Sequence, residues 1–195
     1  MTVPDSAAGV PTGAPAARAD LLRRIDELVR LVPDYPQPGI LFRDIMPLLA
    51  DAEAFAATVE GLAAPFRGER PDKVAGIEAR GFIFGAPVSQ LLGVGFVPVR
   101  KKGKLPGDVV AASYDLEYGS ATIEVTADAF AEGDRVLIVD DVLATGGTAA
   151  AAVRLVRQCG AEVVGIAMLM ELGFLQGRDA LRGVHAPEPH VLAVV

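Results

Sequence analysis

The stretch from Val136 to Thr148, VLIVDDVLATGGT, constrains the fold of this chain more than any other. Four consecutive apolar residues, Val136 to Val139, predict a parallel strand that is covered on both faces. Asp140 and Asp141 follow directly, and open α/β sheets bind their ligands at this end of a strand. The small residues after them predict a loop that opens a helix and that a ligand can approach closely.

The loop favours an anionic ligand, whereas the two carboxylates beside it repel one. Successive N–H groups of such a loop can converge on a phosphate, and two hydroxyls add donors. A sugar phosphate such as ribose 5-phosphate satisfies both parts, with its phosphate on the loop and its hydroxyls on the carboxylates. The pattern is neither a Walker A loop nor GxGxxG. The plainer alternative is a strand–turn–helix in which Gly-Gly is only turn chemistry. The predicted loop residues are Ala144, Thr145, Gly146, Gly147 and Thr148.

VLIVDDVLATGGT resembles the phosphoribosyl diphosphate (PRPP) signature of the type I phosphoribosyltransferases. The similarity extends over roughly Leu21 to Met170, and within the family it is to the members that act on adenine. It implies a Rossmann-like parallel sheet flanked by helices, with a small N-terminal hood and a flexible β-hairpin loop. It also implies the purine salvage reaction in which adenine and PRPP give AMP and diphosphate. Asp140 and Asp141 would then bind the ribose hydroxyls.

Composition narrows the class of protein. The chain has 195 residues, 51% hydrophobic and 22% charged, which suits a compact fold with a sizeable core. Its net charge of −7 argues against nucleic-acid or membrane-surface binding. The lone Cys159 excludes an intrachain disulfide, and with only two histidines no zinc site is expected. No membrane span or secretory signal is visible, so we expect a cytoplasmic protein.

The N-terminal region divides into a tail and a covering helix. Residues 1–18 are rich in Pro, Ala and Gly without periodicity, which predicts a disordered tail. A single phosphoribosyltransferase domain is expected from residue 19 to residue 195. Asp20 is predicted to cap a helix that continues through Val32 and stops at Pro33.

The hood is expected at about residues 33–48, where two prolines and a glycine predict an extended, turning path. The segment YPQPGILFRDI resembles the family's hood over the base. On that resemblance Leu41 and Phe42 sandwich the purine, and the Arg43 region reads its edge. Taken alone, the segment favours a plain loop with one salt bridge. A structural role for Arg43, through Asp44, is an equal alternative to contact with the base.

A second anion site is predicted after the short buried strand at 73–77. Arg80 there follows Glu78 and Ala79, and a plain Glu78–Arg80 salt bridge is the alternative. GIEARGFIFGAPV resembles the family's pyrophosphate loop. On that resemblance Arg80 holds the diphosphate, because the guanidinium suits forked recognition of oxygens. A cis peptide is then expected between Glu78 and Ala79.

Arg100, Lys101, Lys102 and Lys104 form the one basic cluster of an acidic chain. It reads as a solvated loop from charge alone. RKKGKLPG also resembles the family's mobile loop, expected at about residues 100–118, which closes over PRPP and excludes water. The resemblance implies that Arg100 and Lys104 contact PRPP. It places Arg100 on the diphosphate of a neighbouring subunit, and therefore implies a homodimer.

Alternation between residues 112 and 125 predicts a hairpin that turns at Gly119 and Ser120. Glu117 and Tyr118 could lie on its solvated face. The resemblance to the family's YxLEYG motif instead makes Glu117 the acid/base group at the adenine nitrogens. Tyr118 would help position the loop or the substrate. A carboxyl group suits this task if closure raises its pKa.

Alternating strands and helices predict a parallel sheet with right-handed crossovers. After the organising strand, Gly160 should end a helix, and the last residues should add an edge strand or cover. Cys159 reads as a buried apolar residue. The predicted strands are 74–77, 95–99, 136–139, 163–170 and 191–195, and the helices are 51–66, 82–92, 149–157 and 172–181.

The resemblance implies Mg²⁺ as cofactor, held mainly through substrate oxygens, so no protein ligand is assigned. The rival enzyme is a phosphoribosyltransferase for hypoxanthine, guanine or xanthine. The rival outside catalysis is a PRPP-sensing regulator of transcription, which would tend to lose Glu117 or add a DNA-binding domain.

Overall fold

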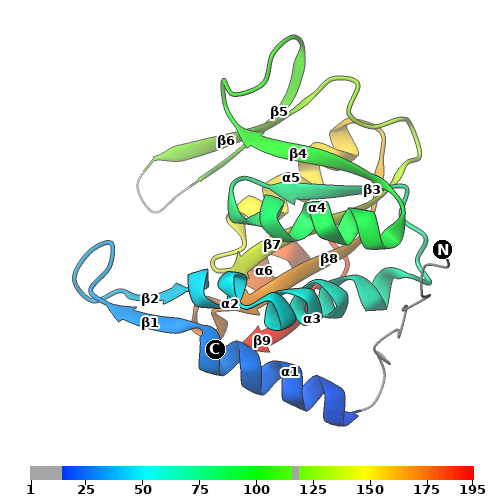
Figure 1. The fold of residues 1–195 in the computed structure, drawn as a ribbon. Helices are drawn as coiled ribbons and strands as arrows, with labels where there is room; N and C mark the ends of the chain where they lie inside the picture. Colours follow the sequence, from blue (N-terminus) through cyan, green and yellow to red (C-terminus); the bar gives the residue numbers. More distant parts are fainter. Residues whose placement is uncertain (1–14, 116–118) are drawn as a thin grey trace, which may run out of the picture. The chain divides into compact units, whose positions relative to one another are not determined.

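The structure is a computed structural model that describes residues 15–115 and 119–195 (Figure 1). The chain separates into two compact units, one up to Ala57 and one from Thr58 onward. The boundary falls inside helix α3 (Ala52–Ala63). The predicted span of a single domain, residues 19–195, stays a prediction.

The first unit contains a helix, a two-stranded hairpin and a short helix. Helix α1 is Pro15–Leu28, β1 is Arg30–Pro33, β2 is Leu41–Asp44 and α2 is Met46–Ala50. β1 and β2 pair antiparallel, with Val32 opposite Phe42. The hairpin connection contains a cis Tyr35–Pro36 peptide bond.

The predicted bounds of the first helix are wrong, and residues 1–14 of the predicted tail lie outside the described part of the chain. The helix was expected from Asp20 to Val32, but it begins at Pro15 and ends at Leu28. Proline suits the first turn of a helix and alanine continues it, so the chain is already helical inside the predicted tail. Val32 leaves the helix because strand pairing with the hood satisfies its backbone groups.

The second unit is built on a seven-stranded sheet in the order β5-β6-β4-β3-β7-β8-β9. Strands β4, β3, β7, β8 and β9 are parallel, whereas β5 and β6 form a hairpin that joins β4 antiparallel. The predicted α/β class with a parallel-dominated sheet is therefore confirmed. The strands are β3 (Lys73–Ile77), β4 (Gly95–Lys101), β5 (Val109–Asp115), β6 (Ser120–Thr126), β7 (Arg135–Leu143), β8 (Glu162–Glu171) and β9 (His190–Val194).

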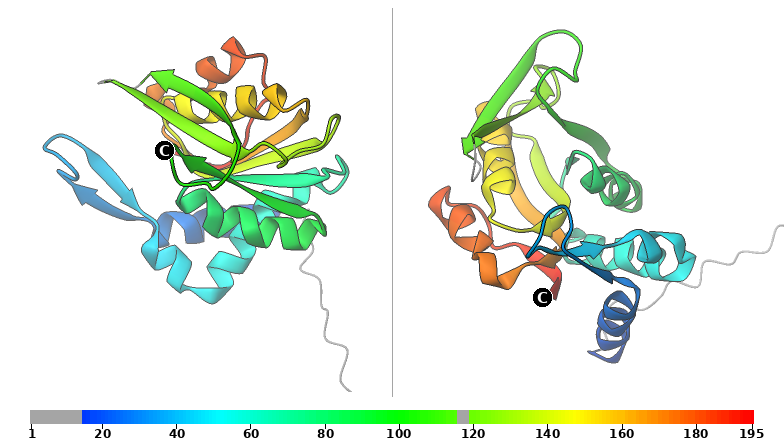
Figure 2. Two further views of the ribbon diagram at one scale, coloured as in Figure 1. Left: turned by 90° about the horizontal axis from the view of Figure 1, so that it is seen from above. Right: turned by 90° about the vertical axis from the view of Figure 1, so that its left-hand side faces the viewer.

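Helices cover both faces of this sheet. Helix α4 (Arg80–Leu92) lies on one face, and α5 (Gly147–Gln158) and α6 (Gly177–Gly183) lie on the other (Figure 2). The run Ala149–Ala152 is buried against the sheet. Its small side chains let α5 approach the strands closely. Gly160 has a left-handed φ of +79° just past α5, as predicted for a helix end. Short 3-10 turns occur at η1 (Ala64–Phe66) and η2 (Gly173–Leu175).

The organising strand is longer than expected. It was predicted to end at Val139, but β7 continues to Leu143, so the two carboxylates lie within the strand. Continued pairing with β8, in which Leu143 lies opposite Glu171, carries the strand past these polar residues. The helix predicted from Leu172 to Leu181 is also wrong in detail, since η2 precedes α6 and Gln176 breaks the two apart with a φ of +53°.

Candidate active site

A pocket of about 380 Å³ opens at the carboxyl ends of β3 and β7 in the second unit. Its volume is in the range of small-ligand sites. Parallel neighbours bring their carboxyl ends to one edge, so segments far apart in sequence meet here. The pocket is lined by Ile77, Glu78, Ala79, Arg80, Lys101, Tyr114, Ile123 and the nine residues from Asp140 to Thr148, together with Ala149.

All five predicted loop residues, Ala144 to Thr148, line this pocket. Gly146 adopts φ +80° at the N-cap of α5, a left-handed conformation that glycine adopts without a side-chain penalty. α5 therefore begins at the pocket wall. The first N–H groups of a helix have no partner within the helix, and they favour an anion at this position.

Asp140 and Asp141 lie side by side at the pocket. Asp141 is buried, with 4% of its surface exposed, and its backbone N–H donates to Asp140 Oδ1 over 2.9 Å. Burial raises the pKa of Asp140 well above its usual range, and the neighbouring charge of Asp141 raises it further. Burial also raises the pKa of Asp141, although the positive charge of Arg80 opposes that shift. Because burial disfavours the charged carboxylates, a cation or a hydroxyl donor bound beside them would stabilise the pair.

Arg80 joins the carboxylates to the second predicted anion site. Its Nε lies 2.9 Å from Asp141 Oδ2, a partner that the sequence did not predict. The Glu78–Ala79 peptide bond is cis, as expected. Gly81 lets the start of α4 approach β7 closely, because a Cβ there would lie 2.8 Å from Val139 O.

Glu78 binds three residues of the basic cluster that begins at Arg100. Arg100 Nε lies 2.8 Å from Glu78 Oε2, Lys104 Nζ lies 2.5 Å from Oε1, and the Lys101 N–H also donates to Oε2. The hydrogen bond from Lys104, followed by that from Arg100, lowers the pKa of Glu78 from its usual 4.5 to about 2. Lys101 lines the pocket itself, whereas Arg100 and Lys104 bind Glu78, which lines it.

Tyr114 is a pocket residue that sequence reasoning missed. The Thr148 hydroxyl donates to Tyr114 Oη over 3.0 Å, which ties the phosphate-type loop to strand β5. Arg154 of α5 also donates to the carbonyl of Ser113. The alternation along β5 could have indicated Tyr114, because residues two apart in a strand point to the same side and Ala112 is buried.

Other predicted residues are not brought into this pocket by the described structure. Leu41, Phe42 and Arg43 belong to the first unit, where β2 presents them and Tyr35 packs edge-on to Phe42 with ring centres 5.1 Å apart. Asp44 accepts hydrogen bonds from Arg30. Glu117 and Tyr118 lie outside the described residues.

The site thus combines a loop suited to a phosphate, paired acids suited to hydroxyls or a developing cation, and an arginine beside them. Residues 48–182 match the phosphoribosyl transferase domain. The adenine phosphoribosyltransferase of Thermobifida fusca is 59% identical over 165 residues, which cover 85% of this chain and 94% of that protein. The chain belongs to the adenine phosphoribosyltransferase family.

Solved structures of this family have the same fold. The adenine phosphoribosyltransferase of Rhodothermus marinus superposes with a TM-score of 0.85 at 51% identity and covers 91% of this chain and 99% of its own. The Saccharomyces cerevisiae member, complexed with an imino-altritol bisphosphate and adenine, gives a TM-score of 0.84 at 39% identity, over 89% and 99% of the two chains.

Within residues 15–115 and 119–195, no three His, Cys, Asp or Glu side chains group as a metal site. No helix in these ranges has the length and apolar character that crossing a membrane requires.

Proposed function

We propose that this chain transfers the 5-phosphoribosyl group of PRPP to N9 of adenine, releasing AMP and diphosphate. The observation that carries the proposal is the shared pocket of the loop Ala144–Thr148, the paired acids and Arg80. A bisphosphorylated sugar needs an anion site at each end and hydroxyl acceptors between them. Adenine is the proposed acceptor base, because the relatives are named adenine phosphoribosyltransferase and the yeast structure contains adenine.

In the proposed complex the 5-phosphate lies on the N–H groups of the loop, that of Thr148 included, with the hydroxyl of Thr145 as a further donor. The Thr148 hydroxyl donates to Tyr114 instead. Asp140 and Asp141 accept hydrogen bonds from the ribose hydroxyls. Their negative charge also favours the positive charge that develops on the sugar as the bond from C1′ to diphosphate breaks. The new bond forms between C1′ and N9.

Diphosphate is held at the opposite end of the pocket by Arg80 and the backbone at Glu78 and Ala79. Arg80 exchanges Asp141 for the leaving group, whose growing charge it stabilises. Lys104 exchanges Glu78 for a phosphate oxygen in the same way, whereas Arg100 leaves Glu78 for a different site. Arg100 is proposed to serve the site of a neighbouring subunit, which makes the functional unit a homodimer.

The proposed adenine contacts come from the resemblance to the family. Leu41 and Phe42 are proposed to hold the flat base between apolar faces, with the Arg43 region at its edge. Glu117 is proposed to take the N9 proton as the glycosidic bond forms, with Tyr118 positioning the loop or the substrate.

Mg²⁺ is the proposed cofactor. The carboxylate oxygens of Asp140 and Asp141 fit a hard cation, and ribose and diphosphate oxygens are further ligands of the kind Mg²⁺ prefers. When bound, the ion neutralises charge on the diphosphate.

A steady-state assay with PRPP, Mg²⁺ and a panel of purine bases tests the proposal. We expect AMP formation from adenine, with kcat/KM for hypoxanthine, guanine and xanthine lower by orders of magnitude. PRPP binding without AMP release would instead identify a sensor, and faster turnover of another purine would replace adenine as the substrate.

A further inference from the structure

The phosphate-type loop packs against helix α6 backbone to backbone. A Cβ on Gly146 would lie 2.2 Å from Gly177 O and 2.9 Å from Ala180 Cβ. A Cβ on Gly177 would lie 2.3 Å from Ala144 O. Each glycine therefore admits the backbone of the other segment, and a displacement of α6 displaces the loop.

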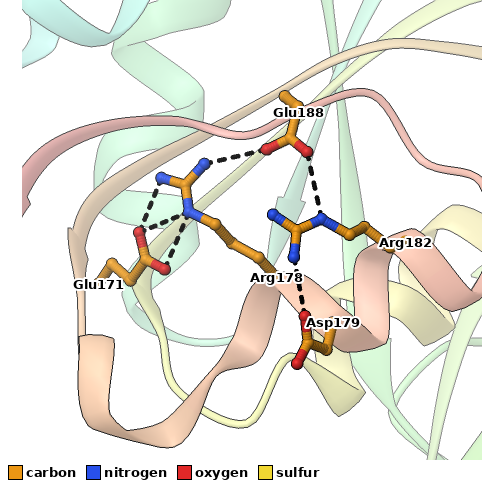
Figure 3. Close-up of polar contacts among 5 residues, drawn as sticks. All are labelled: Glu171, Arg178, Asp179, Arg182 and Glu188. Carbon is orange, nitrogen blue, oxygen red and sulfur yellow. Dashed lines mark hydrogen bonds and ion pairs between the residues drawn. The ribbon is translucent and has the colours of Figure 1, made fainter.

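The start of α6 is fixed in turn by a forked ion pair at the end of β8 (Figure 3). Arg178 Nε lies 3.0 and 2.9 Å from the two carboxylate oxygens of Glu171, and Nη2 lies 2.7 Å from Oε2. Glu171 is buried, with 5% of its surface exposed, and it pairs in the sheet with Leu143, the last residue before the loop. The Leu172 N–H also donates to Leu143 O.

These contacts close a ring of connections around the loop. β7 leads into the loop, the loop packs on α6, Arg178 of α6 binds Glu171, and Glu171 lies beside the end of β7. Among the described residues, those lining the pocket include none from α6. The helix therefore acts on the pocket through the loop rather than by touching a ligand.

We propose that Gly177, Arg178 and Glu171 are positioning residues that set the geometry of the 5-phosphate loop, and we call the three the loop brace. This inference rests on the proposed function. A loop of alanine, glycine and threonine has few side-chain contacts with which to hold its own shape, so its N–H groups converge only if a neighbouring element fixes the backbone. Small displacements matter, because a shift of about 1 Å in such a site can cost about 100-fold in activity.

The chemistry of the pair requires arginine. The planar guanidinium donates to both oxygens of Glu171 at once, which fixes the direction of α6 as well as its distance. Lysine keeps the charge without the fork. Arg182 on the same helix offers a control, since it is 60% exposed, pairs with the exposed Asp179 and shares Glu188 with Arg178 without contacting Glu171 in Figure 3.

The test uses two probes that occupy opposite ends of the proposed site. Binding of ribose 5-phosphate and of inorganic diphosphate is measured by calorimetry for wild type, Arg178→Gln, Arg178→Lys and Arg182→Gln. We expect Arg178→Gln to weaken ribose 5-phosphate binding by about 10- to 100-fold. Diphosphate binding should stay within about threefold of wild type, because the brace contacts the 5-phosphate loop and the proposed diphosphate residue Arg80 pairs with Asp141 instead. Arg178→Lys should fall between, and Arg182→Gln should match wild type for both probes.

Steady-state kinetics supply the second readout. KM for PRPP should rise in Arg178→Gln more than kcat falls, whereas general damage to the fold would weaken both probes and lower kcat together. Unchanged ribose 5-phosphate binding in a folded Arg178→Gln overturns the brace, and so does equal weakening of both probes. If that variant lacks a cooperative unfolding transition, Glu171→Gln and Arg178→Lys are judged by the same two criteria. A wild-type chain that fails to bind ribose 5-phosphate overturns the proposed function itself, and the brace with it.

Discussion

Arg80 and Asp141 form an ion pair of 2.9 Å between Nε and Oδ2, although one residue begins α4 and the other lies in β7. The guanidinium is about one third exposed and the carboxylate is buried. The pair therefore presents a cation to the pocket while keeping a buried acid partnered. On the proposed reaction, PRPP binding exchanges this internal partner for a diphosphate oxygen.

Replacing Arg80 should damage turnover far more than folding. We expect Arg80→Ala to lower kcat/KM by about 100- to 1,000-fold, the usual loss for one group that stabilises developing charge. The matched control is Arg67→Ala, which removes only a surface pair with Glu60. Steady-state kinetics with adenine and PRPP, together with thermal melts, make the comparison. Unchanged kcat/KM in Arg80→Ala would remove this residue from the mechanism.

Gly146→Ala tests the close packing behind the loop. The substitution combines a φ of +80° with a Cβ only 2.2 Å from Gly177 O, so we expect lost stability and lost ribose 5-phosphate binding. Gly133→Ala is the control, because it has the same φ of +80° with nothing within 4 Å of the new Cβ. The control should cost about 1 kcal/mol of unfolding free energy, as strain at a positive φ does. Denaturant unfolding measures both, and equal losses would argue against tight packing at Gly146.

Asp140→Asn should stabilise the ligand-free protein at neutral pH while lowering activity. The folded pKa of Asp140 is raised by burial and by Asp141, so ionisation above its unfolded value of 3.8 penalises the folded state. Asparagine keeps an Oδ1 acceptor for the Asp141 N–H and carries no charge. The gain in Tm over wild type should be present at pH 7 and vanish towards pH 3. A Tm at pH 7 below that of wild type would contradict the assignment.

Glu78→Gln should show the opposite pH dependence. The folded pKa of about 2 lies below the usual 4.5, so Glu78 contributes stability above pH 4.5 and loses it as pH falls towards 2. We expect the variant to lose on the order of 1–2 kcal/mol at pH 6, after allowance for solvent screening. The difference should shrink steadily below pH 4.5. Unfolding curves across this range provide the measurement, and a pH-independent difference would exclude the linkage.

Tyr114→Phe tests the contact that the sequence analysis missed. Losing one neutral hydrogen bond from Thr148 should raise KM for PRPP by about fivefold, equivalent to about 1 kcal/mol. The aromatic ring is retained, so the melting temperature should change little. A KM equal to that of wild type would show that the Thr148 hydroxyl needs no anchor.

Local signals predicted much of the fold and of the candidate site. The apolar run Val136–Val139, with acids and small residues after it, was enough to predict the central strand and the loop, because both depend on neighbouring residues. The same holds for Arg80, which follows a short buried strand. The parallel order of strands followed from their alternation with helices.

Pairings across the sequence could not be predicted in the same way. Arg80 was assigned a diphosphate, but its partner Asp141 depends on the approach of α4 to β7, which Gly81 permits. The ion pair between Arg178 and Glu171 in the loop brace depends on β8 ending beside Leu143 of β7. The β1–β2 hairpin was missed because Val32 fits helical spacing, and only pairing with Phe42 makes it a strand.

The most direct test of the account is a crystal structure of this chain with AMP bound. We predict that oxygens of the 5′-phosphate lie within hydrogen-bond distance of main-chain N–H groups between Thr145 and Thr148, with the ribose hydroxyls facing Asp140 and Asp141. A 5′-phosphate bound anywhere else, including beside Arg80, would contradict the account.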